Sequence, residues 1–351
     1  MLNIAVQKPC YCNFLNLFNQ IMKKIFFLLT AVLLNYYLQA QTVKVLTAGT
    51  KTSLRGLSVV SDKTVWVSGS SGTVGLSLNG GANWNWMSVK GYEKRDFRDI
   101  EAFDDSTALI MAVDEPAYIL KTTDAGKSWK TVYTNAEKGM FLDAMDFNRK
   151  NGIVIGDPIK GKFFIAKTND AGETWQEMHL ENRPVADSGE ACFASSGTNI
   201  RLLNNNKPIF ISGGASSHLF FQNKKRMLPI IQGKESTGAN SIAYKNKKMF
   251  VVVGGDFNQK DAKEKNCFIT YNAGKSWIAP QISPLGYRSC IEFIKHKIWI
   301  TCGLNGIDIS RDNGKEFTSI STEGFHVCRK SPIGNVVFFA GSNGRVGSCV
   351  L

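Results

Sequence analysis

Ionisable side chains recur in the sequence beside short apolar segments with the character of β-strands. Some lie at the start of such a segment, and others lie in the loops that follow. If both groups meet on one face, crowded carboxylates would supply the acid and base of glycoside hydrolysis, and arginines would bind an anionic ligand. We expect Glu190 to be the catalytic residue, with Asp99, Asp143 and Asp256 as partners. The ligand-binding candidates are Arg55, Arg98, Arg288, Asp114, Glu115, Asp157 and His326. A wet channel lined by polar groups, without any ligand, is the simpler alternative.

Metal and cofactor chemistry find little support in the sequence. Six cysteines follow residue 40, without a Cys-x-x-Cys pair or a histidine at metal-ligand spacing, so we expect no metal site. Dinucleotide and flavin fingerprints are also absent from the sequence, so we expect no cofactor. Cys290 and Cys302 face each other across a predicted hairpin centred on His296. A disulfide and two unpaired buried thiols both fit this spacing.

One turn motif recurs along the chain and defines the elements that must position these residues. It reads Ser/Thr-x-Asp/Asn-x-Gly-x-x-aromatic, and its five copies end at Trp84, Trp129, Trp175, Trp277 and Phe317. The spacings are 45, 46, 102 and 40 residues, so a degenerate copy is expected midway through the long gap, with Met227 in the aromatic place. Asp or Asn bonds to nearby backbone, Gly supplies a positive φ, and the aromatic ring fills the space between neighbouring sheets.

Each repeat predicts four short strands within about 44 residues, which is typical of a β-propeller blade. The chain is therefore predicted to be all-β, with seven blades. Their inner strands should begin near Leu54, Phe97, Phe141, Gly189, Ala239, Arg288 and Phe325. The last blade lacks an outer strand, and Thr42–Leu46 has no other partner. We expect this N-terminal strand to complete blade seven and so close the ring.

The first forty residues predict an export signal rather than part of the fold. Lys23 and Lys24 precede the apolar run Ile25–Leu34, with cleavage expected after Ala40. We interpret residues 1–21 as a mis-assigned upstream extension, 22–40 as the signal peptide and 41–351 as one propeller domain. The apolar run is too short for stable membrane insertion. We therefore expect a periplasmic or secreted protein.

Composition and charge limit the classes of partner that the protein could bind. A hydrophobic content of 43% excludes a disordered chain, and the net charge of +13 falls to +10 (39 − 29) when Lys8, Lys23 and Lys24 are removed. Basic runs with interleaved aromatic residues are missing, so we expect no nucleic-acid partner. The surplus charge favours an anionic ligand or a solvated basic surface. We expect a monomer.

The turn motif is the Asp-box, or BNR repeat, and it covers the whole predicted domain. Its Thr-Thr-Asp-Ala-Gly-Lys-Ser-Trp form, Thr122–Trp129, and the blade number resemble the photosystem II stability/assembly factor-like propellers. That resemblance implies an exported seven-bladed propeller that acts as an assembly module. The chain is more distantly similar to the six-bladed sialidase-like glycoside hydrolases. Their arginine triad would correspond by position to Arg55, Arg98 and Arg288, with Tyr287 beside the last.

Two functions therefore compete for the face on which these residues converge. The first is binding of a protein or glycan without catalysis, with the surplus positive charge favouring an anionic ligand. The alternative is a glycoside hydrolase that uses the carboxylates. Two buried acids about 5–10 Å apart at a pocket floor would favour the enzyme. An arginine-rich patch without such a pair would favour binding.

Overall fold

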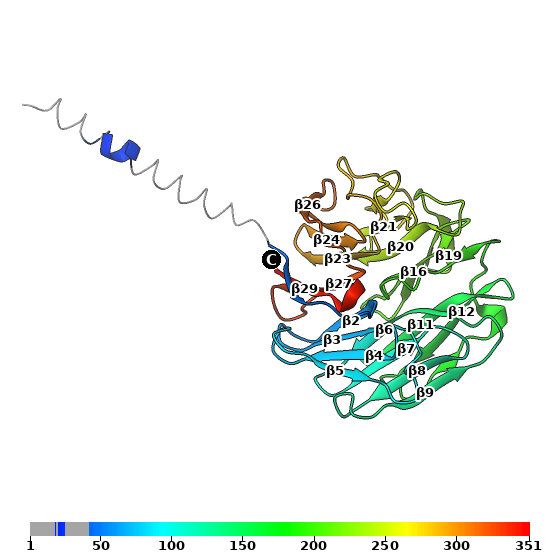
Figure 1. Ribbon diagram of the computed structural model, residues 1–351. Coiled ribbons are helices and arrows are strands. Elements are labelled where there is room, and N and C mark those ends of the chain that lie inside the picture. Colours follow the sequence, from blue (N-terminus) through cyan, green and yellow to red (C-terminus); the bar gives the residue numbers. More distant parts are fainter. Residues whose placement is uncertain (1–17, 19, 25–41) are drawn as a thin grey trace, which may run out of the picture. The chain divides into compact units, whose positions relative to one another are not determined.

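The computed structural model describes residues 18, 20–24 and 42–351 of the protein (Figure 1). The chain divides into two compact units, residues 1–41 and 42–351. In the first unit the described residues are helical and exposed. The apolar run Ile25–Leu34 and the expected cleavage site after Ala40 lie outside the described residues. Among the residues that are described, no helix combines the length and the hydropathy of a transmembrane span.

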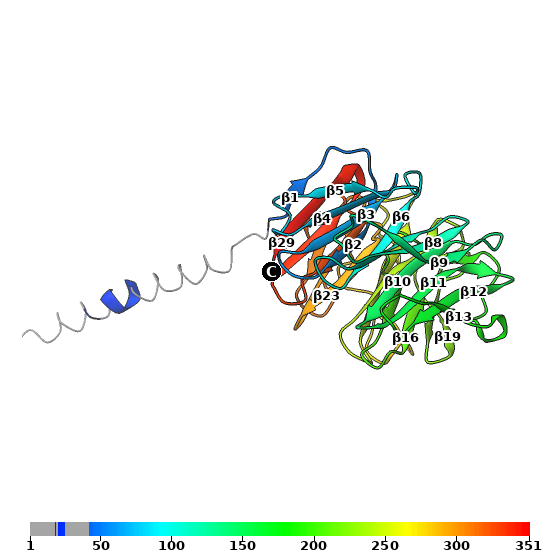
Figure 2. The same cartoon turned by 90° about the horizontal axis from the view of Figure 1, so that it is seen from below.

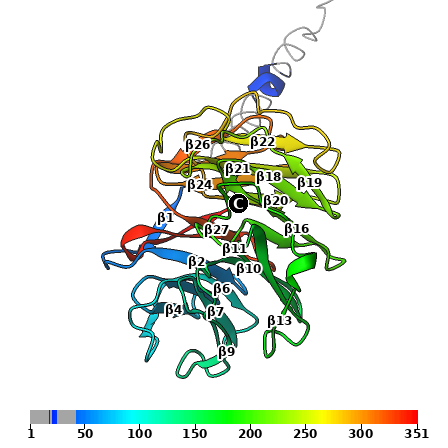
Figure 3. The same ribbon diagram turned by 90° about the vertical axis from the view of Figure 1, so that its right-hand side faces the viewer.

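Residues 42–351 form seven small antiparallel sheets arranged as a seven-bladed β-propeller, as predicted. In Figure 3 the strands β2, β6, β10, β20 and β27 lie around the middle of this unit, and β9, β13 and β26 lie toward its periphery. Blade 1 contains β2 (Leu54–Val59), β3 (Val65–Gly69), β4 (Thr73–Ser77) and β5 (Asn85–Ser88). Blade 2 contains β6 (Phe97–Ala102), β7 (Ala108–Ala112), β8 (Ala117–Thr122) and β9 (Lys130–Asn135). Blade 3 contains β10 (Leu142–Asn148), β11 (Asn151–Ile159), β12 (Lys162–Thr168) and β13 (Gln176–Glu177), followed by the 3₁₀ turn η1 (Leu180–Asn182).

The remaining blades follow the same order with two additions. Blade 4 contains β15 (Ile200–Leu202), β16 (Pro208–Ile211), β18 (His218–Phe221) and β19 (Lys224–Met227). Blade 5 contains β20 (Thr237–Tyr244), β21 (Phe250–Asp256) and β22 (Cys267–Thr270), and its sheet also includes β14 (Glu190–Ala191) and β17 (Gly213–Gly214). Blade 6 contains β23 (Cys290–Lys295), β24 (Ile298–Gly303), β25 (Gly306–Ser310) and β26 (Thr318–Ser321). Blade 7 contains β27 (Val327–Lys330), β28 (Val336–Ala340), β29 (Val346–Val350) and β1 (Lys44–Thr47), with η2 (Ser342–Gly344) before β29.

The predicted closure of the ring is present. β1 pairs antiparallel with β29, with Lys44 opposite Ser348 and Val45 opposite Gly347. Figure 2 shows the blue strand β1 beside the red strand β29. The two ends of the propeller unit therefore share one sheet, and the edge of β29 is covered.

The Asp-box turns have the geometry that their sequence predicts. In blade 2 the Thr122 hydroxyl donates to Asp124 Oδ1 at 2.8 Å and accepts from the Gly126 N–H at 2.9 Å. Asp124 Oδ1 also accepts from the Ser128 N–H at 2.9 Å, and Gly126 has a φ of +82°. The box aromatic then packs toward the preceding blade, since Trp129 joins the cluster built on Trp66 of blade 1. Each box therefore seals one interface between blades.

Blade 4 departs from the prediction at both ends. Its inner strand begins at Ile200 and not near Gly189, because Glu190–Ala191 instead pairs with β17 in the sheet of blade 5. The expected degenerate box is a two-residue hairpin turn at Gln222 and Asn223, both with positive φ, as in a type I′ turn. Met227 is 67% exposed and does not occupy the aromatic place. Blade 4 thus has no box aromatic.

The residues before β15 cross the middle of the propeller. We call residues 193–199 the axial segment. Its Ser196 hydroxyl donates to the carbonyl of Ser289 in blade 6 at 2.7 Å, and the Thr198 hydroxyl donates to Ser241 in blade 5 at 2.7 Å. Gly197 has a φ of +63°, and a Cβ there would lie 2.2 Å from the Asp99 carboxylate of blade 2. This close approach to several inner strands explains why blade 4 exceeds the repeat length.

The hairpin that carries Cys290 and Cys302 is as predicted, with the two residues directly opposite. Both are buried free thiols, as are the other four cysteines that follow residue 40. Cys328 of blade 7 joins them, with its Sγ 3.6 Å from Cys290 Sγ.

Candidate functional site

The starts of the inner strands and several neighbouring loops surround a pocket of about 380 Å³ on one face of the propeller. We call it the axial pocket, because the axial segment supplies part of its wall. Arg55 comes from β2, Arg98 from β6, and His326 directly precedes β27. Its full lining is Arg55, Arg98, Phe141, Cys192, Phe193, Ala194, Ser195, Asn240, Phe257, Tyr287, Leu304 and His326. None of these twelve described residues is an acid.

The charge of the two arginines is only partly neutralised. Arg98 Nε lies 2.8 Å from Asp96 Oδ2, whereas Arg55 donates only to the carbonyl of Ser195, at 3.4 Å. Burial, and then the charge of Arg98, lower the pKa of Arg55 below its ordinary value. The two guanidinium groups repel each other in a partly desolvated pocket. A bound anion is therefore favoured, because its charge would offset both this repulsion and the cost of desolvation.

His326 lies in the same pocket as a neutral ring. Its Nε2 is 2.9 Å from the Ser342 hydroxyl and 3.3 Å from that of Ser53. Burial, and then the positive charges of Arg55 and Arg98, lower the pKa of His326 to about 3. The imidazole is therefore uncharged at neutral pH and serves as a hydrogen-bonding group rather than as a further cation.

The predicted catalytic carboxylates are not brought together in the axial pocket. Glu190 is buried beside β17, where its Oε1 lies 3.0 Å from His218 Nδ1 and its Oε2 lies 2.7 Å from Lys225 Nζ. Burial opposes its ionisation, but hydrogen bonds from His218, Lys225 and Ser212 keep the pKa of Glu190 below its ordinary value. Glu190 therefore faces its hydrogen-bond partners within blade 4 and not the pocket.

Asp99 and Asp143 are fully buried and do not line the pocket. Asp99 accepts from the N–H groups of Ile100 and Met145, at 2.9 and 2.8 Å, and so joins the inner strands of blades 2 and 3. Burial raises the pKa of Asp99 to about 7. Burial, and then the neighbouring carboxylate of Asp157, raise the pKa of Asp143 well above its ordinary value. Both side chains are inner-strand residues that the pocket does not expose.

The other predicted residues lie outside the lining of the axial pocket. Asp157 accepts from the Cys192 N–H at 2.9 Å, and burial raises its pKa to about 6. Asp114 and Glu115 are exposed on one loop, where Glu115 Oε2 accepts from the Gly139 N–H. Asp256 ends β21 and accepts from the Asn258 N–H. Arg288 is fully buried in an ion pair with Asp308, with Nη2 2.5 Å from Oδ2.

Two side-chain clusters have donor sets that would suit a metal ion. The sulfur atoms of Cys290, Cys302 and Cys328 lie within 4.8 Å of one another, as do ligand atoms of Asp187, Glu190 and His218. The thiol group lies in the apolar core, and burial raises the pKa of Cys302 and Cys328 well above the ordinary value. The second group is already joined by hydrogen bonds to Lys225 and Ser212.

Comparison with known proteins finds a matching family model and similar solved structures. Residues 85–187 match the family described as "Photosynthesis system II assembly factor YCF48", and this range includes two complete Asp-boxes. No curated protein sequence matches the chain. Among solved structures, "YCF48 bound to D1 peptide" is similar with a TM-score of 0.61 at 14% identity, covering 88% of this chain and 97% of that one. The protein is a BNR-type β-propeller that is similar to photosystem II assembly factors over residues 85–187.

Two further structures resemble this assembly factor-like propeller. "YCF48 from Cyanidioschyzon merolae" has a TM-score of 0.59 at 15% identity and covers 88% of this chain and 99% of that one. The computationally designed Ika8 protein has a TM-score of 0.55 at 12% identity and covers 88% and 100%. A designed protein matches almost as well as natural ones, so these likenesses report the fold.

The sequence did not reveal a second hollow of the assembly factor-like propeller, of about 530 Å³, at the other ends of the inner strands. Arg201 lies there between Asp146 and Glu292, with nitrogen–oxygen distances of 3.4 and 3.5 Å. Burial raises the pKa of Glu292. Arg329, which also lines this hollow, donates to the carbonyls of Ser196 and Gly197, so the axial segment separates the two hollows. Only the alternation of polar residues at the strand ends could have signalled it.

The neutral state of His326 predicts a pH dependence of stability. Between about pH 6.5 and pH 3 the unfolded chain binds a proton at this residue that the folded protein does not, so stability falls as the pH falls through this window. His326→Gln should remove about 2 kcal/mol of the stability loss between pH 7 and pH 5. Urea unfolding of both proteins at the two pH values measures this, and equal losses would contradict it.

Proposed function

We propose that this propeller is a non-enzymatic assembly module that binds a protein partner, with an anionic group of that partner in the axial pocket. The observation that carries the proposal is the pair Arg55 and Arg98 in a pocket whose described lining contains no carboxylate. A glycoside hydrolase would need two acids exposed to the same ligand. Here the candidate acids Asp99 and Asp143 are buried and do not line the pocket, and Glu190 is bonded to Lys225.

The shape of the pocket supports a peptide ligand. Phe141, Phe193 and Phe257 provide apolar wall, and the ring of Phe193 meets that of Phe257 edge-on with centroids 5.9 Å apart. The Ser195 hydroxyl donates to Asn240 Oδ1 at 3.0 Å, so the polar contacts available to a ligand come from Arg55 and Arg98. A similar propeller has been solved with a bound peptide. We further propose that binding takes place outside the cytoplasm, after cleavage near Ala40.

A peptide array with each sequence made as a free C-terminal carboxylate and as an amide tests this proposal. The wild-type protein should prefer carboxylate or acidic peptides. Arg55→Ala and Arg98→Ala should each weaken that binding about tenfold to a hundredfold, because a hydrogen bond to a charged group contributes about 1.5–3 kcal/mol. Lys150→Ala removes one charge from an exposed position and is the matched control.

The outcome that overturns the proposal is equal binding by the arginine variants and the control. Turnover of glycosidase substrates would favour the enzymatic alternative, and binding confined to a glycan array would favour a sugar ligand. The peptide array, the glycosidase assay and the glycan array all use residues 41–351. One protein preparation therefore decides between the three functions.

A further inference from the structure

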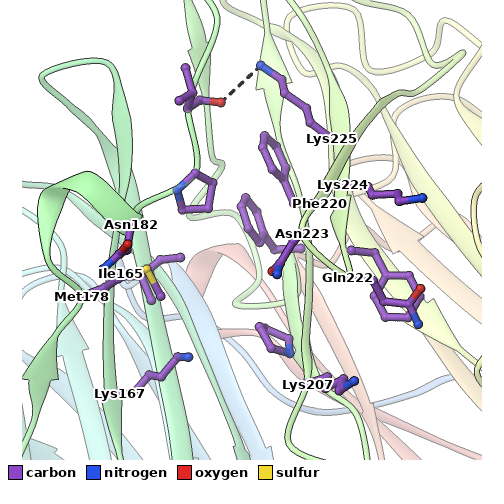
Figure 4. Close-up of a pocket in the computed structure, with 15 residues that line it drawn as sticks. Ile165, Lys167, Met178, Asn182, Lys207, Phe220, Gln222, Asn223, Lys224 and Lys225 are labelled. Carbon is purple, nitrogen blue, oxygen red and sulfur yellow. Dashed lines mark hydrogen bonds between the residues drawn. The ribbon is translucent and has the colours of Figure 1, made fainter.

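A larger pocket lies away from the axis, between blades 3 and 4. We call it the interblade pocket; its volume is about 660 Å³. Blade 3 contributes Ile165 and Met178, and the segment after it contributes Asn182, Pro184 and Val185. Blade 4 contributes residues of β16, of β18 and of the turn at Gln222 and Asn223. Figure 4 shows the labelled side chains of both blades around this space.

The space lies at an interface between blades that no Asp-box aromatic fills. At four other interfaces the box aromatic packs toward the preceding blade: Trp129 toward blade 1, Trp175 toward blade 2, Trp277 toward blade 4 and Phe317 toward blade 5. Blade 4 has only its two-residue turn, and the cluster between blades 3 and 4 contains no box aromatic. The interblade pocket therefore lies at the interface that a box of blade 4 would have sealed.

The floor of the interblade pocket suits an aromatic ring. Phe210 and Phe220 stack with centroids 4.3 Å apart and planes within 4°, and each meets Phe163 beneath them edge-on. Phe220 is 7% exposed and Phe210 4%, so both are held by the core. A ring inserted here would meet fixed apolar surface at little cost in side-chain order.

The rim carries positive charge that the described part of the protein does not neutralise. Lys167, Lys207 and Lys224 are exposed pocket residues, and none of the three forms an ion pair with a described residue. Lys225 is different, because Asp187 and Glu190 hold its ammonium group at 2.6 and 2.7 Å, above the ring of Phe220. Lysines around an apolar floor are complementary to a ligand whose aromatic group enters the pocket and whose acidic groups remain at the rim.

We propose that the interblade pocket is a second binding site, which takes an aromatic side chain from an acidic peptide segment of a protein partner. The ring would fill the place of the absent box aromatic, and flanking carboxylates would meet Lys167, Lys207 and Lys224. The site is separate from the axial pocket and shares no lining residue with it. Its occupation does not depend on the function proposed above.

The test uses a fluorophore in the pocket and a defined peptide. Met178→Cys labelled with bimane places a dye that tryptophan quenches on contact; the native cysteines after residue 40 are buried. We expect saturable quenching by the blocked peptide Glu-Asp-Trp-Asp-Glu. Its Ala-for-Trp version should not quench, and a version with Lys in place of the acids should bind at least tenfold more weakly.

Charge reversal provides the matched comparison. Lys167→Glu with Lys224→Glu should weaken quenching at least tenfold, whereas Lys150→Glu with Lys247→Glu, an exposed pair away from the pocket, should leave it unchanged. Arg55→Ala should also leave it unchanged. The proposal is overturned if the acidic peptide does not quench, if the two double variants behave alike, or if only phosphatidylglycerol vesicles bind to the lysines.

Discussion

Removal of β1 should destabilise the whole propeller, although the strand has only four residues. A chain that begins at Ala48 loses the pairing with β29, and it loses Leu46, whose side chain packs against the first box turn at Gly81. The lost backbone bonds and apolar contact together contribute about 2–4 kcal/mol. The melting temperature should fall by roughly 5–10 °C.

The control for this prediction is a chain that begins at Thr42, which keeps the strand and removes residues 1–41. Thermal unfolding followed by circular dichroism compares the two proteins directly. Equal melting temperatures would mean that β1 does not close the ring. The truncated chain should also associate at high concentration, because β29 then presents an unpaired edge.

Arg288→Ala should cause the largest loss among single substitutions discussed. Arg288 Nε and Nη2 lie 2.6 and 2.5 Å from Asp308 Oδ2, and both side chains are almost wholly buried. Its Nη1 also donates to Tyr287 O and Asn305 Oδ1. Truncation leaves the Asp308 carboxylate buried without its counter-charge, and the free energy of unfolding should fall by about 3–5 kcal/mol.

A double variant separates the charge effect from simple loss of volume. Arg288→Met combined with Asp308→Leu should recover much of the loss, since a buried ion pair exchanged for apolar groups is often tolerated. Arg98→Ala is the exposed comparison: the side chains of Arg98 and Asp96 are 30% and 24% exposed, and this pair should contribute about 1 kcal/mol or less. Urea unfolding measures all three, and a small effect of Arg288→Ala would contradict the argument.

The sequence predicted the architecture well wherever a repeat carried its own turn. Hydroxyl, Asx and Gly at fixed spacing define the geometry found around Thr122, Asp124 and Gly126, so strand order followed without long-range information. Blade 4 was predicted poorly because it has no such turn. A type I′ turn at Gln222 and Asn223 lacks the usual glycine signal, and a run of small residues at 194–198 gives no sign that it crosses the axis.

The site was harder to predict than the fold. Arg55, Arg98 and His326, each at or just before the start of an inner strand, line one pocket. Position in the strand could not indicate which residue each of these side chains bonds to. Arg288 occupies a comparable place in blade 6 but is committed to Asp308, and that pairing depends on a residue twenty positions away in the third strand. The rotamer of such a side chain and the residue to which it bonds decide whether it is available to a ligand. The repeat pattern of the sequence specifies neither of them.

The axial segment has a consequence for how any polypeptide could be held. Because residues 193–199 bridge the inner strands, the axial pocket is a blind well and not a tunnel. A polypeptide cannot thread through this propeller; it can offer the pocket only a terminus, a sharp bend or a side chain, and it must leave by the mouth through which it entered. A long internal stretch of extended chain can therefore reach the two arginines only with its side chains.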